Sequence, residues 1–545
     1  MEAMESSLAM TWYDYRKATI AMVALGTPLM AAFFLQYAQG FIGLMFIGRL
    51  GSNELASATL TMSFFNNTAF TIIAGFLSGM ETIGSQALGA LHGEKFVLVT
   101  QKGAMITSLV LVPLGVLWWY SGELFVLLIN KNIAIMTGKC MRDTIPGLVG
   151  VAAFEWAKRY LQTQQIGSPI FWSTGIGTGT CALLYWGLIH KAHLGVYGGM
   201  LAFGLVYVVN AIVLIAIIIR RSYTSKYHDL GEEIDEFIRL RPLSKKSFLG
   251  WGAYFQVALP STATLFFEYW AWQAVNMLAP MLPNADHETA AFGIAFEMCY
   301  ICVLMPLGLS QASCVLVATA IGEHNARRAR RLMLLGYGLT FMFSLCSSVT
   351  VFLLRHEIPK MFSHDPLVHE AAARALKVSS AIMIFDAGNQ IGSGIFRACN
   401  WQRVTAWLTV VHYVVGLPVA WFVGVKTTHN AAGLYMGLLV STIITSGTQA
   451  VIALFVIDFQ KAIDEMAENL ADEEAEEMSE GTALLTELAT SSGSDFFFKE
   501  DKGAARVKYE RPSKSALIRP LIRSSYGAFD PYGMDDDESA KRRAL

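Results

Sequence analysis

Three carboxylates lie inside long apolar stretches of this 545-residue chain. Glu268 is flanked on both sides by aromatic residues, Glu297 lies in the run AFGIAFEMCYI, and Asp386 lies in IMIFDAGNQIG. An ionisable residue inside a membrane-spanning segment costs several kcal/mol and is by default a candidate for ion or substrate binding. A protonated, hydrogen-bonded packing residue would explain one of them, but three in the same half of the chain favour a working site.

The surroundings of these carboxylates predict exchange of a proton for a cation. No Lys or Arg lies in the apolar core of the three segments, so burial and mutual repulsion favour the protonated form. Once deprotonated, the same groups can hold a cation, and aromatic neighbours add cation–π attraction. We therefore interpret Glu268, Asp386 and Glu297 as proton- and substrate-binding residues. Five further side chains are candidates for the lining of a substrate cleft: Tyr269, Trp270, Gln273, Asn66 and Gln39.

The composition of the chain requires a membrane around these groups. Apolar residues make up 54% of the sequence and charged residues 15%, and the mean hydropathy is +0.43. A soluble protein could not hide so much apolar surface. The formal net charge of −2 gives no global basic field for nucleic acid, and the hydropathy excludes disorder for the bulk of the chain.

Apolar segments long enough to span a bilayer recur along the chain, six in each half. The first six lie near 20–47, 55–80, 100–128, 142–163, 168–190 and 195–219, and the second six near 251–282, 289–320, 332–354, 373–396, 404–425 and 431–458. The segment 142–163 is the weakest, because charged residues crowd its ends. The fold class predicted is an all-α polytopic membrane protein with twelve transmembrane helices.

Charge in the loops predicts the orientation. With the N-terminus in the cytosol, the inner loops carry about twice as many Lys and Arg residues as the outer loops. Lys158 and Arg159 are counted here among the inner loop residues. Both termini are therefore expected in the cytosol.

The two halves read as copies of each other. The stretch Gly79–Gly93 followed by Glu94 overlays Gly308–Gly322 followed by Glu323, at an offset of 229. Pro28 overlays Pro260, and Gly198 overlays Gly433, at similar offsets. An even number of spans gives both copies the same orientation, which predicts two parallel six-helix repeats with a substrate site between them near the midplane.

Composition also divides the chain. We expect a cytosolic segment over 1–19, a first lobe over 20–219, a cytosolic linker with an amphipathic helix over 220–250, a second lobe over 251–458, and a cytosolic, mostly disordered tail over 459–545. The tail carries two short sorting-like patterns, Glu480–Leu485 and Tyr526–Phe529, which lean toward a vacuolar or endolysosomal membrane over the plasma membrane.

The remaining polar residues and the cysteines are expected to have structural roles. Glu81 and Gln86, far down the second segment, are expected to serve a structural or gating motif. The seven cysteines do not form a disulfide framework, and no metal or cofactor motif is present. We expect no enzymatic activity, no metal and no cofactor, and a monomer.

The chain resembles the eukaryotic branch of the multidrug and toxic compound extrusion (MATE) family between about Leu25 and Val456. The motifs that carry the resemblance are short, but they occur in one order over twelve spans: Met45–Ala56, Glu81–Ala90, Phe267–Trp270, Met305–Ser310, Ala320–Asn325, Gly394–Gln402 and Val415–Pro418.

The resemblance implies a V-shaped pair of six-helix lobes with alternating access, and antiport of cationic or amphipathic compounds against protons or, in some members, sodium. It also implies that Glu268 and Asp386 are the proton and substrate carboxylates, and that Glu297 corresponds to an acid of animal-like members. Bacterial members of one subfamily use an aspartate in the first span, which this chain lacks. The family's aspartate after the second span is Glu81 here.

Four alternatives remain. A membrane scaffold or receptor without turnover would leave the three carboxylates unexplained. A lipid-linked oligosaccharide flippase would need a basic groove, whereas the intramembrane charges here are acidic. A sodium-coupled antiporter would share the fold. An intramembrane enzyme would need a His/Asp, Ser/His or metal cluster at one depth, and no such cluster is present in the spans.

Overall fold

The computed structural model describes residues 12–127, 131–224 and 241–468. The helices of the first half are α2 (Trp12–Ile47), α3 (Ser52–Phe65), α4 (Thr71–Gly89), α5 (Gly93–Val126), α6 (Lys131–Thr163), α7 (Ser168–Trp186) and α8 (Gly195–Thr224). Those of the second half are α10 (Trp251–Asn276), α11 (Ala285–Gly322), α12 (Ala326–Leu354), α13 (Ile358–Phe362), α14 (Pro366–Ala398), α15 (Gln402–Val411), α16 (Leu417–Ala420) and α17 (Ala431–Val451).

Short π-helical turns extend or join several of these helices. They are η1 (Asn66–Phe70), η2 (Gly187–Lys191), η5 (His412–Gly416), η6 (Trp421–Thr428) and η7 (Ile452–Val456). With these turns included, each of the twelve expected segments corresponds to one continuous helical stretch. Helices suit a bilayer because they satisfy every backbone hydrogen bond internally.

Hydropathy alone recognises only part of this set. Among the described residues, eight helices are long and apolar enough to cross a membrane. The other four long stretches are α6, α7, α10 and α14, of which α6, α10 and α14 contain the buried charges discussed below, while α7 is rich in Gly and Thr. The helices that hydropathy misses are therefore mostly those that carry chemistry.

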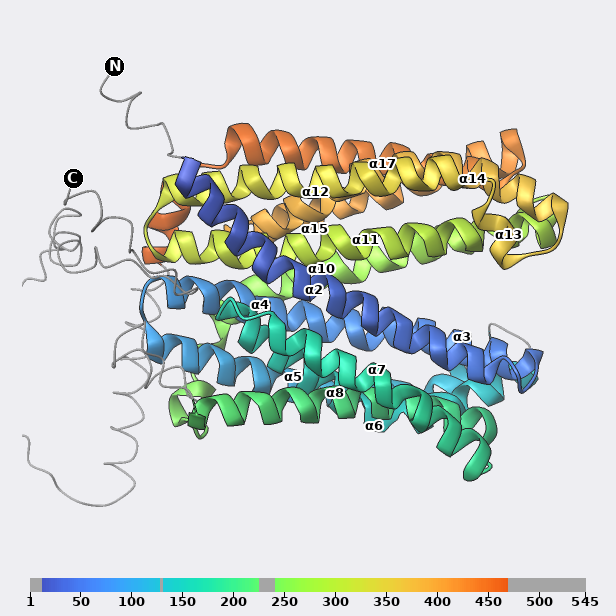
Figure 1. The fold of residues 1–545 in the computed structure, drawn as a ribbon, viewed down its shortest axis with the longest axis horizontal. Coiled ribbons are helices and arrows are strands. Elements are labelled where there is room, and N and C mark those ends of the chain that lie inside the picture. Colours follow the sequence, from blue (N-terminus) through green and yellow to red (C-terminus); the bar gives the residue numbers. More distant parts are fainter. Residues whose placement is uncertain (1–11, 128–130, 225–240, 469–545) are drawn as a thin grey trace, which may run out of the picture.

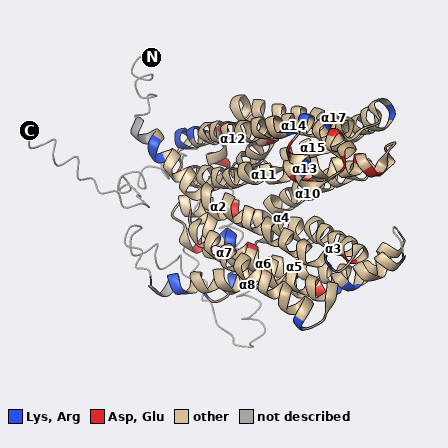
Figure 2. Ribbon diagram, turned by 45° about the vertical axis from the view of Figure 1, so that its right-hand side comes forward, with Lys and Arg blue, Asp and Glu red and all other residues tan. Residues whose placement is uncertain are grey.

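The helices form two bundles, α2–α8 and α10–α17, which we call the N-lobe and the C-lobe. The lobes approach each other at the end of the molecule where α4 and α11 end, and their helices diverge toward the opposite end, which gives a V shape (Figures 1 and 2). We call these the closed end and the splayed end. Most of the charged residues lie near the two ends of the molecule, and few lie in the middle of the helices (Figure 2).

Two glycines set the contact at the closed end. A Cβ atom added to Gly89 would lie 2.2 Å from the Thr319 carbonyl oxygen, and one added to Gly322 would lie 2.1 Å from the Gln86 carbonyl oxygen. No side chain fits at either position, so the backbones of α4 and α11 cross in direct contact.

This crossing also corrects the register of the internal repeat. The left-handed residues Leu91 and His324, and the turn bonds from His92 N to Ala87 O and from Asn325 N to Ala320 O, are equivalent at an offset of 233. The offset of 229 drawn from the sequence is wrong by four residues. Glycines recur about one helical turn apart in this motif, so a shift of one turn still pairs glycine with glycine.

One further expectation needs correction. Lys158 and Arg159 are not loop residues: they lie within α6 and are 1% and 4% exposed. Without them the inner loops still carry the larger share of basic residues.

The first residues of the expected tail, 459–468, are helical and bury Phe459, Ile463 and Met466. The rest of the tail lies outside the described residues.

Part of the connection between the lobes is docked on α5. The Gln101 amide donates to the carbonyl oxygens of Arg241 and Pro242 and accepts from the Ser244 N–H at 3.0 Å. The amphipathic helix expected near 228–239 and both sorting-like patterns of the tail lie outside the described residues.

Candidate substrate and proton site

Glu268 lies in the C-lobe and is held by amides. Its Oε1 accepts hydrogen bonds from Gln390 Nε2 at 3.2 Å and from Asn389 Nδ2 at 3.5 Å. Neutral donors orient the carboxylate without fixing its charge, so the group remains able to exchange a proton. The side chain is half-buried.

Asp386 joins this group through the helical repeat of α14. Residues three and four positions apart lie on one face of a helix, so Asp386, Asn389 and Gln390 share a face. Asp386 is 4% exposed and interacts electrostatically with Glu268. Two of the three predicted carboxylates therefore form one site, and they come from α10 and α14.

A second layer of polar residues positions the amides. Gln449 on α17 donates from Nε2 to Asn389 Oδ1 at 2.8 Å, and the Ser310 hydroxyl donates to the Gln390 carbonyl oxygen at 2.6 Å. Sequence reasoning missed Gln449 and Asn389. Each is an amide side chain in an apolar segment, which is the signal that could have identified it. Amides do not titrate, so this signal is weaker than that of a carboxylate.

Glu297 lies apart from this pair. It accepts a hydrogen bond from the hydroxyl of Tyr37, which belongs to the N-lobe, and the Tyr37 and Tyr300 rings are 5.5 Å apart. The structure therefore brings Glu268 and Asp386 together and leaves Glu297 at the boundary between the lobes.

The remaining candidates for the cleft have different surroundings. Tyr269 is half-buried and interacts electrostatically with Tyr300, and the indole N–H of Trp270 is buried without a partner among the described residues. Gln273 is half-buried further along α10, and Asn66 begins the π turn η1 and is also half-buried.

Gln39 is bonded entirely within the N-lobe. Its Nε2 donates to the Thr174 carbonyl oxygen at 3.1 Å and to Thr178 Oγ1 at 3.0 Å, and its Oε1 accepts from Asn210 Nδ2 at 3.2 Å. This N-lobe network consists of amides and hydroxyls, so it offers no titratable group.

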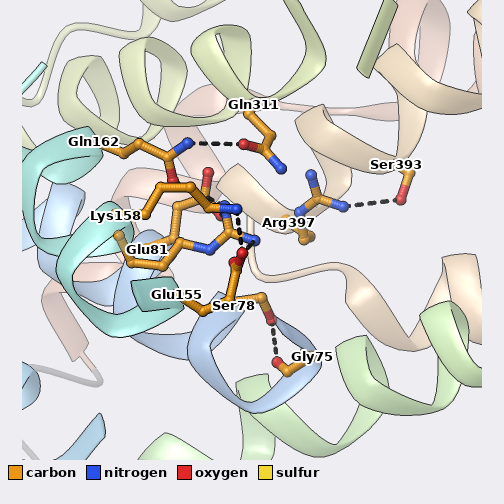
Figure 3. A network of polar contacts seen from close by, with 10 residues as sticks. Gly75, Ser78, Glu81, Glu155, Lys158, Gln162, Gln311, Ser393 and Arg397 are labelled. Carbon is orange, nitrogen blue, oxygen red and sulfur yellow. Dashed lines mark hydrogen bonds and ion pairs between the residues drawn. The ribbon is translucent and has the colours of Figure 1, made fainter. Parts of the chain in front are cut away.

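A buried charge cluster on α4 and α6 was not foreseen. Lys158 and Glu155 form an ion pair, and Arg159 lies 3.5 Å from Glu81 and 3.9 Å from Glu155 (Figure 3). The rings of Phe33 and Phe154 lie 5.0 and 5.6 Å from the Lys158 ammonium. Two acids and two bases balance, which makes burial of this cluster tolerable. Glu81 is therefore part of an ion cluster.

Hydrogen bonds from this region cross to the C-lobe. Gln162 Nε2 donates to Gln311 Oε1 at 2.8 Å, and Gln86 Nε2 donates to the Ala398 carbonyl oxygen at 2.9 Å (Figure 3 shows the first). Arg397 approaches the same region from α14. These bonds tie the lobes together near the closed end and suit the gating role expected of Gln86.

Replacing Lys158 by Met tests the cluster. The change removes the cation and leaves Glu155 buried without its main partner, which costs about 3 to 5 kcal/mol in known cases. We expect a clearly lower midpoint of thermal unfolding in detergent, measured by tryptophan fluorescence. Adding Glu155→Gln should restore most of the loss, and Lys377→Met, at an exposed position, should leave the midpoint unchanged. If the Lys158→Met variant unfolds at the same temperature as the wild type, the ion-pair assignment is contradicted.

A metal centre finds no support in the described parts of the chain. No group of three or more His, Cys, Asp or Glu side chains there could hold a metal ion.

His412 lies in the C-lobe core, where its Nδ1 is 2.9 Å from the Ser441 hydroxyl, so it acts as a hydrogen-bonded packing residue.

Comparison with known proteins gives consistent matches. The family model described as MatE matches residues 28–186 and 260–422. Protein DETOXIFICATION 10 of Arabidopsis thaliana is 28% identical over 441 residues, which cover 80% of this chain and 88% of that protein. Protein DETOXIFICATION 12 of the same plant is 27% identical and covers 78% and 88%.

Solved structures match at the level of the whole bundle. The crystal structure of the eukaryotic MATE transporter AtDTX14 has 25% sequence identity and a TM-score of 0.76, and covers 84% of this chain and 99% of that chain. A MOP superfamily transporter from Pyrococcus furiosus has 16% identity and a TM-score of 0.71, covers 83% and 97%, and is similar in fold. The two segments that match the family model begin at Pro28 and Pro260, one in each repeat.

Proposed function

Because this chain belongs to the MatE family, and is thus a membrane transporter of the multidrug and toxic compound efflux type, we propose that it exports organic cations in exchange for protons. The exchange uses alternating access of the two lobes. Other amphipathic small molecules of similar size are included in the substrate class. The chain acts by transport and carries out no chemical conversion.

The observation that carries this proposal is the environment of Glu268. The carboxylate accepts hydrogen bonds from two amides and has a second acid, Asp386, as a neighbour, and the base that acts on it, Arg397, forms no ion pair with it among the described residues. A proton or a substrate cation can each offset negative charge at this pair, and we expect binding of one to disfavour binding of the other. Binding of a proton at the splayed end then releases the cation, which is antiport.

Transport by the wild type under two gradients tests this function. Purified protein in liposomes is given a fluorescent organic cation, and either a proton gradient or a sodium gradient is imposed. We expect the proton gradient alone to drive accumulation, and collapse of that gradient by a protonophore to abolish it. Accumulation driven by a sodium gradient alone would mean that sodium, and not the proton, is the coupling ion. If folded protein transports nothing under either gradient, the proposal that the substrate is an organic cation is overturned.

The orientation, oligomeric state and cellular membrane of the chain are proposed as well. We propose that both termini face the cytosol, that the protein is a monomer, and that the domain limits are those given above. We also propose a vacuolar or endolysosomal membrane, with the plasma membrane as the alternative. Imaging of a chain ended at residue 468 beside the full chain tests the sorting role, because residues 459–468 pack into the described structure.

A further inference from the structure

Helices α2 and α11 belong to different lobes and pack against each other along a continuous seam. Ser313 is 3.7 Å from the Met22 sulfur, and a Cβ atom on Gly308 would lie 2.5 Å from the Met30 side chain. The residue numbers rise on α2 as they fall on α11, so the two helices run in opposite directions. Tyr37 continues this series and contacts Glu297.

Tyr37 is the last residue of α2 in the seam whose side chain bonds to the C-lobe. Two residues further on, Gln39 bonds only to α7 and α8 of its own lobe. The hydroxyl of Tyr37 donates to Glu297 Oε2, and its ring rests against Tyr300. The bond therefore closes the seam at its splayed end.

The bond lies closer to the splayed end than the Glu268 site does. Tyr269, the residue after Glu268 on α10, interacts electrostatically with Tyr300 on α11. Glu297 precedes Tyr300 by three residues, and α11 runs from the splayed end to the closed end, so Glu297 lies about 5 Å beyond Tyr300 toward the splayed end. A cation that leaves Glu268 toward the splayed end therefore comes next to the level of Glu297.

The internal repeat shows that packing does not require this bond. The equivalent seam joins α10 and α4, where a Cβ atom on Gly75 would lie 2.4 Å from Thr262, as Gly308 meets Met30 in the first seam. At the same offsets Tyr269 takes the place of Tyr37, and Phe64 takes the place of Glu297. Phe64 packs against Phe125 within its own lobe, so the second seam is built without a tyrosine–carboxylate bond and the carboxylate in the first serves a purpose beyond packing.

We propose that Tyr37 is a displaceable partner of Glu297, which a cation must replace on its way out through the splayed end. The carboxylate can be held by the tyrosine hydroxyl or by a cation, and the two compete. When the cation departs, Tyr37 takes the carboxylate back and ties α2 to α11 again. Tyr37 is thus a positioning residue that sets how long the cation stays, and this inference rests on the cation efflux proposed above.

Removal of the hydroxyl alone tests this competition. Tyr37→Phe keeps the ring against Tyr300 and removes the donor. We expect the purified protein to bind tetraphenylphosphonium about tenfold more tightly at pH 8, because hydrogen bonds to charged groups are strong and the cation no longer displaces one. In liposomes the same variant should show a lower KM and a lower maximal rate, since release is slowed.

A double-mutant cycle separates this role from a purely structural one. Glu297→Gln should weaken binding, and Tyr37→Phe should then have no additional effect, because the competed group is gone. Tyr435→Phe is a matched control: its buried hydroxyl donates to the Phe292 carbonyl oxygen at 2.9 Å within the C-lobe, and binding should be unchanged. Tyr37→Leu, which also lacks the donor, replaces the phenylalanine variant if the latter does not fold.

Two results would overturn the inference. One is unchanged or weaker binding by Tyr37→Phe when the wild type binds the cation. The other is the same gain in affinity with and without the carboxylate at 297. If the wild type itself neither binds nor transports the cation, the proposed function fails first, and the inference fails with it.

Discussion

Liposomes that contain the Glu268→Gln variant should show no accumulation of an organic cation above protein-free liposomes when a proton gradient is imposed. Glutamine keeps the volume of the side chain and can still bond to Gln390 and Asn389. It cannot take up or release a proton, and it offers no charge to a cation. Because both events take place at one carboxylate in the proposed exchange, the loss should be complete.

Two companion variants make this result specific. Glu268→Asp retains a titratable group one methylene shorter, and should transport more slowly but still in response to the gradient. Glu123→Gln removes an exposed carboxylate of α5 and should transport like the wild type. Normal proton-driven transport by folded Glu268→Gln would end the assignment of this carboxylate. Asp386→Asn is expected to resemble Glu268→Gln, because both acids belong to one site.

The second large effect is expected from Gly89→Leu. A Cβ atom at this position would lie 2.2 Å from a backbone oxygen of α11, and backbone cannot move aside as a flexible side chain does. The lobes should then no longer meet at the closed end, so the cycle is interrupted. We expect the rate of cation transport to fall by more than tenfold, since a state with a misplaced contact of this size is rarely populated.

The same substitution at an open position provides the control. Gly115 lies in α5 with no atom within 4 Å of the place where a Cβ would stand, so Gly115→Leu should transport normally. Binding of the fluorescent cation to Gly89→Leu in detergent should persist, which separates a blocked cycle from a destroyed site. Transport at the wild-type rate would mean that the closed end opens and closes without the glycine crossing.

The sequence predicted the elements and the main acids because both leave a strong local signal. Most of the twelve spans are clear apolar runs, and Glu268 and Asp386 each place a charge within a largely apolar segment. Asn389 and Gln390 were not among the candidates, although helical spacing places both on the face of Asp386. What the sequence could not supply is the distance between helices, so it did not separate Glu297 from the other two acids.

The ion cluster was missed for a related reason. Lys158 and Arg159 come near the end of the weakest apolar segment, where basic residues are typical of a loop. The spacing of Glu155, Lys158 and Arg159 at three and four residues did indicate pairing along a helix face. The hydrogen bond of Tyr37 to the opposite lobe had no signal in the sequence, since tyrosines are common in membrane proteins.

The repeat at an offset of about 233 has a consequence for how such a molecule can be built. If one half existed alone and paired with a second copy of itself, a two-fold axis would make both seams identical. Every substitution would then occur twice, so a proton-binding acid in one copy would require the same acid in the other. Fusion of both copies in one polypeptide removes that constraint: Gln36 stands where the second half has Glu268, and Val151 where it has Asp386. The second half can then carry the acids that bind ions, while the first half provides the surface against which the second half moves.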